Sequence, residues 1–517
     1  MRSSKIHNQR GEDIMSQGLL PFKYEIEKRE GGLTALGGVG LYLDMFRVLK
    51  LGHILDSSIG IRDSDQGYAD RQIGLLLILL NIIGGDCVED LERLEQDDGF
   101  CRLWEKLERR GKLAKRFRRK SQRKLPAAST VFRYLEAFHQ EAPREQGQAI
   151  IPESNRHLRG FINANRKLIA KVQRLKVEKT ATLDGDATVA ETWKESALYT
   201  YQGGKGYQPM NVFWREMEMI LHTEFRDGNV PANHDILRIF KEALALLPTG
   251  VTEVLYRSDC ASYQHDLLGY MDDEVEIDRL KERFGRIGFA ISCPVTEAYK
   301  TAVYEVAETE WLPLDVDGTG KLIPGGREWA EICFVPSAIG HKKRGREYRY
   351  FATRQELVER PLPGIEEQLE FPFPVLKMKQ KRYKVFGVVS NLNWAGEKMI
   401  GWHDERCGKS EEAHAILKND LAGGMFPSGK FGANAAWWWY AALAFNVQSA
   451  MKQLVLDAHW RNKRMKAIRF HLIHLPARVL LHANRLIIRV AAGTDTYSAL
   501  LRARTRMMTL ARAPASG

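Results

Sequence analysis

The pattern of hydrophobic and polar positions predicts helices in the first part of the chain. Apolar residues recur at helical spacing in "GGVGLYLDMFRVLK" and "CVEDLERLEQ", and the run Ile73 to Ile83 predicts a buried core helix. That run is too short to cross a bilayer and contains Asn81. We therefore expect residues 33–150 to form an all-helical N-terminal domain behind a polar tail, residues 1–32.

Residues 178–293 alternate between strand and helix patterns. "TATLDGDATVA" predicts one strand, "NVFWREMEMILHTEFRDGN" predicts a two-stranded hairpin, and "PANHDILRIFKEALALLP" predicts a helix. The strand "EVLYR", a helix through "DDEVEIDRLKERFG" and the strand "IGFAISC" follow. Three antiparallel strands followed by helix, strand, helix and strand are the element order of the ribonuclease H-like fold, a mixed sheet covered by helices.

Residues 294–395 are predicted to be a β-rich insertion, with strands at "TAVYEVAE", "EICFVPS", "REYRYFATR" and "KRYKVFGVVS". The final helices of the core are expected in residues 396–450, and a helical basic region in 451–517. The aromatic run Trp437 to Tyr440 is predicted to be core rather than a base-stacking surface. The predicted fold class is therefore α/β, a ribonuclease H-like mixed sheet with an insertion, placed between helical N- and C-terminal regions.

The net charge of the chain indicates a class of partner. Lys and Arg number 77 against 65 Asp and Glu, a formal charge of +12. A surplus of this sign favours a polyanionic partner. Six cysteines without Cys-x-x-Cys spacing argue against a disulfide framework and a zinc site, and they fit a reducing cytoplasm. A length of 517 residues allows two or three domains.

Cationic residues cluster in three places that suit contacts with DNA phosphates. The first cluster precedes a helix expected to begin at Ser129 or Thr130, and its alternative role is a solvated linker. The second flanks strands of the insertion, where lysines that protect an edge strand explain it nearly as well. The third lies on a helix expected from Pro476, which either grips DNA or is solvated. The candidate DNA contacts are Arg109, Arg110, Arg116, Arg118, Arg119, Lys342, Lys343, Arg478 and Arg485.

Acidic residues fall at the ends of two predicted strands. "TLDGDATVA" places Asp184 and Asp186 on one face, where two like charges are unfavourable unless a cation neutralises them. Either the pair belongs to a metal site, or Asp-Gly marks a hairpin turn with both carboxylates in solvent. Asp259 lies just beyond the fourth strand, which would lie beside the first and bring Asp259 near Asp186. Alternatively, Asp259 caps the following helix together with Ser258.

A further acidic residue lies on a helix predicted from Ser410 to Leu421, with Ser410 as its cap. Glu411, His414 and Lys418 share one face of this helix, because seven residues make nearly two turns. An acidic residue in a first helical turn is commonplace, so the pattern alone assigns it no role.

These segments together resemble a known family. "LDGDAT", the arginine-serine-aspartate at 257–259 and "FPSGKFGANAAWWWYAALAFN" resemble DDE transposases of bacterial insertion sequences. The resemblance is strongest to the insertion-sequence 1380 family of the IS4-like group, and it extends over residues 30–490.

The family signature on the last helix runs Tyr, two residues, Arg, three residues, Glu, six residues, Lys. In this sequence His403 takes the tyrosine position, and four residues separate Arg406 from Glu411. The spacing from Glu411 to Lys418 is intact. The altered register leaves Glu412 as an alternative for the glutamate.

The resemblance implies a site and its chemistry. The implied catalytic acids and metal ligands are Asp186, Asp259 and Glu411. They would hold two Mg²⁺ ions, with Mn²⁺ as a substitute, and Asp184 would be an additional ligand or a group outside the ligand set. Arg406 and Lys418 would contact phosphates beside the reacting centre.

The implied function is cut-and-paste transposition, by metal-dependent cleavage and transfer of DNA strands. The expected partner is double-stranded DNA, both element ends and target, bound by a homodimer in the bacterial cytoplasm, with no membrane association. Two alternatives stay open: a catalytically inactive, transposase-derived DNA-binding protein, and a ribonuclease H-like nuclease that cleaves without joining.

Overall fold

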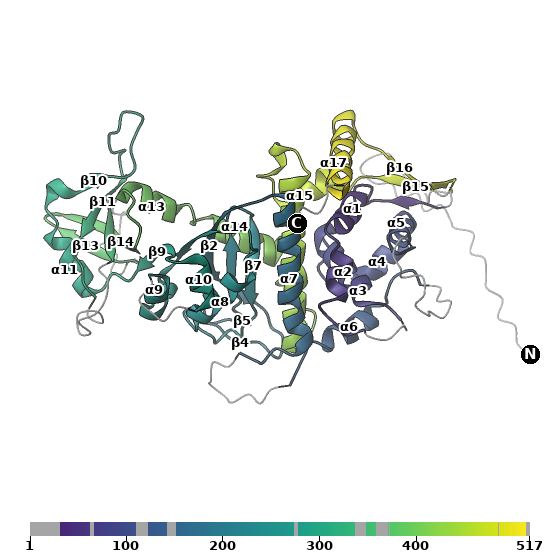
Figure 1. The fold of residues 1–517 in the computed structure, drawn as a ribbon, viewed down its shortest axis with the longest axis horizontal. Coiled ribbons are helices and arrows are strands. Elements are labelled where there is room, and N and C mark those ends of the chain that lie inside the picture. The colour runs from purple at the N-terminus through teal and green to yellow at the C-terminus, as the bar shows by residue number, and fades with distance from the viewer. Residues whose placement is uncertain are drawn as a thin grey trace, which may run out of the picture.

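The computed structural model describes residues 31–62, 67–109, 123–141, 151–272, 278–336, 348–357, 371, 373–483 and 485–512. Along its long axis the molecule has a helical part, a central part with the large sheet, and an outer lobe of strands (Figure 1). None of the described helices is long and apolar enough to cross a membrane.

Helices dominate the N-terminal part, as the apolar spacing predicts. They are α1 (Gly40–Val48), α2 (Leu51–Asp56), α3 (Asp70–Ile83), α4 (Asp90–Gln96), α5 (Asp98–Arg109) and α6 (Ala128–Glu136). Helix α3 is buried along nearly its whole length, so the prediction of a core helix is confirmed. Helix α6 follows Ala127, whose backbone is extended, so Ser129 and Thr130 lie inside the first turn and the predicted cap is wrong. The expectation of helices alone is also corrected, because strand β1 (Leu33–Thr34) is present.

Two long helices join the N-terminal part to the sheet. They are α7 (Arg156–Leu175) and α15 (Phe431–Leu454), and both pack on strand β7 (Met219–Glu224). In α15 the indole of Trp437 donates to the carbonyl oxygen of Ala422 at 2.7 Å, and that of Trp438 donates to Thr223 Oγ1 at 2.9 Å. The aromatic run is therefore core, as predicted.

The large sheet contains the strands predicted for residues 178–293. Five of them lie side by side in the order β7, β6, β2, β8, β9. Strand β2 runs antiparallel to β6 and parallel to β8, and β8 runs parallel to β9. The fourth predicted strand thus lies beside the first. The remaining bounds are β2 (Thr180–Ala187), β6 (Met210–Trp214), α8 (Ile236–Leu246), β8 (Glu253–Ser258), α9 (His265–Met271), α10 (Arg279–Phe284) and β9 (Gly288–Cys293).

The region predicted to be a β-rich insertion continues the same sheet, because strand β14 pairs antiparallel with β9. Its strands are β10 (Leu312–Pro313), β11 (Arg327–Ile332), β12 (Arg349–Glu356), β13 (Val375–Met378) and β14 (Lys381–Ser390). The strand predicted at "TAVYEVAE" is wrong, since this segment overlaps helix α11 (Glu297–Glu305). Thr296 caps that helix by accepting from the Tyr299 amide, and Tyr299 and Val303 face the core four residues apart. A small separate sheet contains β3 (Ala190–Glu191), β4 (Leu198–Tyr199) and β5 (Lys205–Tyr207).

The C-terminal region corrects the prediction of a helix from Pro476. Strands β15 (Ala477–His482) and β16 (Arg485–Val490) form a hairpin there, and β15 also pairs with β1. Helix α17 (Thr494–Arg512) follows and packs on α1 (Figure 1). The other helices of this half are α13 (Gly396–Asp404), α14 (Lys409–Ala415) and α16 (Met465–Ile468).

Candidate active site

The two aspartates of "LDGDAT" lie in the middle of the large sheet, on β2 between β6 and β8. Gly185 separates them within the strand. Glycine is needed at this position because a Cβ atom there would lie 2.4 Å from the hydroxyl oxygen of Tyr256. The alternative of a solvated Asp-Gly hairpin turn is therefore wrong. Both carboxylates point to one face of a strand whose side chains are largely buried.

Asp184 is bound by a buried arginine on the neighbouring strand. Its two oxygens accept from Nε and Nη2 of Arg257 at 2.7 and 2.9 Å, and the two side chains are 2% and 0% exposed. Arg257 also donates to the carbonyl oxygen of Trp402 and lies 4.9 Å from the centre of that ring. Asp184 therefore holds the arginine that ties α13 to the sheet. If Asp184 were a metal ligand, its carboxylate oxygens would have to give up their hydrogen bonds from Arg257.

Asp259 follows directly after β8, at the same edge of the sheet as Asp186. Its Oδ1 accepts from the amide of Ala261 at 3.0 Å and caps the short 3₁₀ turn Cys260–Ser262, so the capping alternative describes one oxygen. Its other oxygen accepts no hydrogen bond from the residues that the structure describes. Ser258 is no cap, because its Oγ donates to the carbonyl oxygen of Gly185 at 2.9 Å and ties β8 to β2.

Glu411 lies in the first turn of α14, which begins one residue before the predicted start. Gly408 precedes the helix with a φ of +76°, a left-handed conformation that glycine adopts without strain. Ser410 therefore lies inside the helix and is no cap. Beyond α14 the chain continues as a π-helical turn, Ile416–Asp420, so Glu411 and Lys418 are not related by regular α-helical geometry. Lys418 Nζ donates to the carbonyl oxygen of Val189 at 2.8 Å.

The carboxylate of Asp186 lies near charged and ionisable groups from three other segments of the chain. Arg406 Nη1 lies 3.5 Å and His414 Nδ1 lies 4.0 Å from Asp186 Oδ2. Burial raises the pKa of Asp186 from 3.8 to about 7; Arg406 opposes that rise, while the charges of Asp259 and Glu411 add to it. The acids at 186, 259 and 411 are thus close enough to interact. Glu411 is among the charges that contribute most to the raised pKa of Asp186.

Burial also keeps the neighbouring imidazole neutral. The pKa of His414 falls to about 3, chiefly because the ring is desolvated, with Lys418 and Arg406 adding to the effect. Burial likewise lowers the pKa of Lys418.

His403, which takes the tyrosine position of the signature, is buried against β8 and β9. Its Nε2 lies 3.3 Å from both Ser292 Oγ and the carbonyl oxygen of Ser258, and the side chain is 1% exposed. It therefore fixes α13 to the ends of β8 and β9.

The raised pKa of Asp186 predicts a pH-dependent gain in stability for Asp186→Asn in the presence of a chelator. Between pH 4 and 7 the folded state binds more protons than the unfolded state, so the folding stability of the wild-type chain falls as pH rises through this window. Asparagine carries no such charge. Urea unfolding should show Asp186→Asn more stable by about 1–4 kcal/mol at pH 8, with a smaller difference at pH 5. An equal difference at both pH values would contradict the assignment.

Several candidate DNA contacts cannot be placed, because they lie outside the described residues. These are Arg110, Arg116, Arg118, Arg119, Lys342 and Lys343. Arg109 ends α5, and nothing is described of its side chain. Arg478 and Arg485 lie on the C-terminal hairpin, where Arg478 is paired across the strands with Arg489 and Arg485 with His482.

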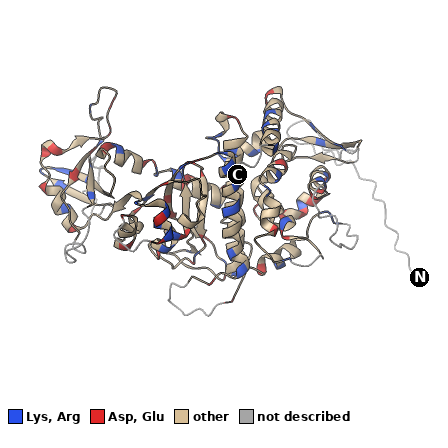
Figure 2. Ribbon diagram, in the orientation of Figure 1, with Lys and Arg blue, Asp and Glu red and all other residues tan. Residues whose placement is uncertain are grey.

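A basic helix that the sequence interpretation missed runs between the N-terminal part and the sheet. Helix α7 contains no acidic residue, and Figure 2 shows Lys and Arg along its length. Arg159, Arg166 and Arg174 are exposed on it. The pKa of Lys171 is lowered chiefly by burial, and the nearby charges of Lys50 and Arg174 add to the effect. The signal was available in the sequence, as cations at helical spacing opposite the apolar positions of "RHLRGFINANRKLIAKVQRL".

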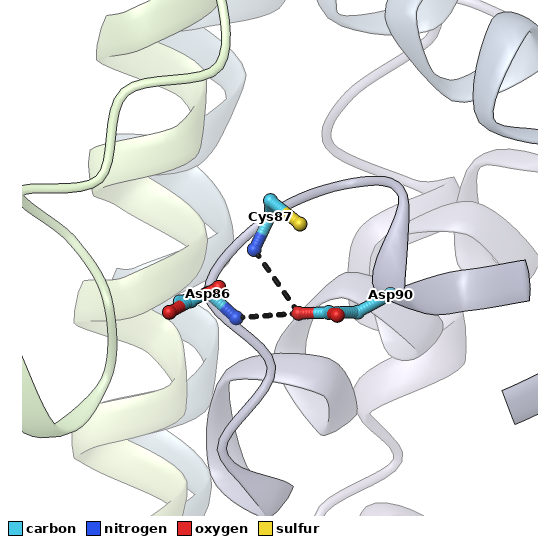
Figure 3. A group of neighbouring side chains, drawn as sticks. All are labelled: Asp86, Cys87 and Asp90. Atoms are coloured by element: carbon cyan, nitrogen blue, oxygen red, sulfur yellow. Dashed lines mark hydrogen bonds between the residues drawn. The ribbon is translucent and has the colours of Figure 1, made fainter. Parts of the chain in front are cut away.

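One compact group of metal-type ligands lies elsewhere. Among the described residues, only Asp86, Cys87 and Asp90 bring ligand atoms of three such side chains all within 4.8 Å of one another (Figure 3). Asp90 Oδ2 accepts from the amides of Asp86 and Cys87 at 2.9 and 3.3 Å. These hydrogen bonds close the turn that leads into α4, and they explain why the three side chains lie together. The carboxylates of Asp186, Asp259 and Glu411 therefore do not all lie within this limit of one another.

Comparison with known proteins gives one family. The family model described as "Transposase DDE domain group 1" matches residues 23–281, just over half of the chain, and this range includes Asp186 and Asp259. No curated protein gives a significant sequence match. A cryo-EM structure of the piggyBac transposase synaptic complex with hairpin DNA is similar with a TM-score of 0.36 and 10% identity, over 94% of this chain and 85% of that chain.

Proposed function

This chain belongs to the transposase DDE domain group 1 family, and from that premise we propose that it cleaves DNA at the ends of a mobile element and joins them to target DNA. Within the family we propose the IS4-like group and its insertion-sequence 1380 branch. The reaction is phosphoryl transfer that depends on divalent metal ions.

The catalytic core in this proposal is a ribonuclease H-like sheet. The strand order β7, β6, β2, β8, β9, with the first three strands antiparallel and the last two parallel to β2, supports it. The insertion then extends the core sheet beyond β9 through β14. Because β2 and β8 are parallel, their carboxyl ends lie at one edge, where open sheets commonly build their sites.

The single observation that carries the proposal is the gathering of three acids from distant segments at that edge. Asp259 and Glu411 both raise the pKa of Asp186, so the three carboxylates share one electrostatic environment. Like charges of this kind are costly to bury without a cation. They come from β2, from the turn after β8 and from α14.

The donor set fits Mg²⁺, which prefers carboxylate oxygens. Two ions would activate the attacking oxygen and stabilise the leaving oxygen. Asp186, Asp259 and Glu411 would hold them, and Arg406 would exchange its contact with Asp186 for a phosphate oxygen. Lys418 Nζ, held by the carbonyl oxygen of Val189, would bind a flanking phosphate.

Helix α7 is proposed as a track for the DNA backbone, together with the basic segments that the sequence predicted. Replacing Arg159, Arg166 and Arg174 by alanine should weaken duplex binding at every sequence. Each lost phosphate contact lowers the slope of log affinity against log salt by about 0.9, so the slope should fall by about 2–3. Fluorescence anisotropy with a labelled duplex over a salt series measures it.

A matched control removes three cations outside α7: Arg279, Lys300 and Lys321. These lie on α10, α11 and in the outer lobe. The control should leave the salt slope unchanged, and an equal fall in both variants would remove α7 from the DNA path.

The function is tested on duplexes that carry the element ends, incubated with the purified chain and Mg²⁺. We expect a cut at the element boundary and joining of the freed 3′ end to a second duplex. A shifted complex without cleavage would instead establish the DNA-binding alternative, and cleavage without joining would establish the nuclease. Cross-linking of the complex tests the expected homodimer.

A further inference from the structure

We propose that His414 is a further ligand of the divalent ion that Asp186 binds. The inference rests on the proposed function and adds a nitrogen ligand to the three carboxylates. It makes the site one of mixed oxygen and nitrogen ligands.

The distance between the two side chains suits a shared ion. Nδ1 of His414 and Oδ2 of Asp186 are 4.0 Å apart, too far for a hydrogen bond. Two ligand atoms that each lie about 2.1 Å from one ion are separated by about 3–4 Å. Arg406 Nη1, 3.5 Å from the same oxygen, supplies the positive charge there and would give way to the ion.

The contact on the other side of the ring supports ligation through Nδ1. Asn211, directly opposite Asp186 on β6, places Nδ2 3.3 Å from Nε2 of His414. Asn211 is 4% exposed, and its Oδ1 is buried without a hydrogen-bond partner among the described residues. As it stands, Nδ2 donates to Nε2 and leaves the ring proton on Nδ1; rotating this amide by a half-turn would place Oδ1 beside Nε2, where it would accept from an Nε2–H, and would leave Nδ2 where Oδ1 now lies.

In the rotated orientation, the amide would select the tautomer that ligation through Nδ1 needs. With its proton on Nε2, His414 presents the Nδ1 lone pair toward the carboxylate of Asp186. A lone pair facing a carboxylate oxygen is repulsive unless a cation lies nearby, which is Arg406 in this structure and would be the bound ion in the loaded site. Metal-binding histidines commonly donate their second ring N–H to an oxygen, as Asn211 Oδ1 would accept here.

The position on the helix gives a second reason. Glu411 and His414 are three residues apart on α14, so both project from one face of the helix. The helix thereby offers one carboxylate and one imidazole to the same edge of the sheet. An imidazole suits Mn²⁺ better than Mg²⁺, which prefers oxygen, so the site should favour Mn²⁺.

The test is pulsed electron paramagnetic resonance of Mn²⁺ bound to the full chain without DNA. We expect nitrogen coupling from a directly bound imidazole in the wild-type protein, which changes to the ¹⁵N pattern when histidine is labelled. In His414→Gln the coupling should disappear, whereas the control His459→Gln, at an exposed histidine, should retain it. The wild-type spectrum decides whether a histidine binds the ion, and the comparison of His414→Gln with His459→Gln decides whether that histidine is His414.

Affinity for the metal alone gives a second readout. His414→Gln should weaken Mn²⁺ binding about 10–100-fold and Mg²⁺ binding by a smaller factor. Bound Mn²⁺ without nitrogen coupling, in a chain where Asp186→Asn weakens Mn²⁺ binding, would overturn the inference and leave the proposed function standing. Mn²⁺ binding that Asp186→Asn does not weaken would instead overturn the proposed function.

Discussion

Replacing Asp186, Asp259 or Glu411 by alanine, one at a time, is expected to reduce DNA cleavage by about 10³-fold or more while DNA binding persists. Metal ions contribute several kcal/mol of transition-state stabilisation, and about 4 kcal/mol corresponds to a factor of 10³. Binding persists because affinity comes mainly from contacts between cations and phosphates. Single-turnover cleavage of an end-labelled duplex, with gel-shift affinity in parallel, measures both.

The neighbouring glutamate provides the matched control. Glu412 lies in the same helical turn as Glu411, and Lys409 Nζ lies 3.5 Å from its Oε2. Glu412→Ala should cleave within about threefold of the wild-type rate, since it loses the ion pair with Lys409 and the charge interaction with Lys452. Retained cleavage in any of the three alanine variants would remove that residue from the site. Loss of cleavage in Glu412→Ala and not in Glu411→Ala would move the third acid by one position.

Replacing Asp184 by alanine is expected to destabilise the fold by about 3–5 kcal/mol, because the buried Arg257 guanidinium keeps only the exposed carboxylate of Glu405, 3.5 Å from its Nη1, as an ion-pair partner. The charge cannot reach water, since Arg257 is fully buried. Replacing both residues, as Asp184→Leu with Arg257→Met, should recover much of that loss, because no unpaired charge remains. Equilibrium unfolding in urea measures the free energies.

The two aspartates of one short stretch should therefore behave in opposite ways. Asp184→Ala should lose folding stability, whereas Asp186→Ala should stay folded and lose cleavage. As a control, Glu297→Ala, whose side chain is 88% exposed, should change stability by less than about 0.5 kcal/mol. A folded, stable Asp184→Ala chain that has lost only metal binding would return Asp184 to the ligand set.

The central sheet could be predicted because its signals are local. Strand alternation in "TATLDGDATVA" and helical spacing in "PANHDILRIFKEALALLP" each fix one element, and the order of elements then places β8 beside β2. The position of Asp259 near Asp186 follows from that order alone.

The C-terminal hairpin could not be predicted so easily, because its cations satisfy two patterns. Arg478, His482, Arg485 and Arg489 are spaced as on one face of a helix. The same spacing is symmetric about a two-residue turn, and the structure pairs Arg478 with Arg489 and His482 with Arg485 across the hairpin. Pairing of β15 with β1, a segment more than 400 residues earlier, selects the hairpin.

The hydrogen-bond partners of the site residues could not be predicted from the sequence either, because they too depend on contacts between distant segments. Nothing local shows that Asp184 belongs to Arg257, or that His414 meets Asn211, because each contact joins distant segments. The acids were found through their place on the strands and the family resemblance. Their roles remain a prediction.

The most direct test of the account is the position of Mn²⁺ in crystals of the chain with element-end DNA, located by anomalous scattering. We expect two peaks about 4 Å apart, in contact with the carboxylates of Asp186, Asp259 and Glu411. Peaks confined to another place, such as the Asp86, Cys87 and Asp90 turn, with none at Asp186, would contradict it.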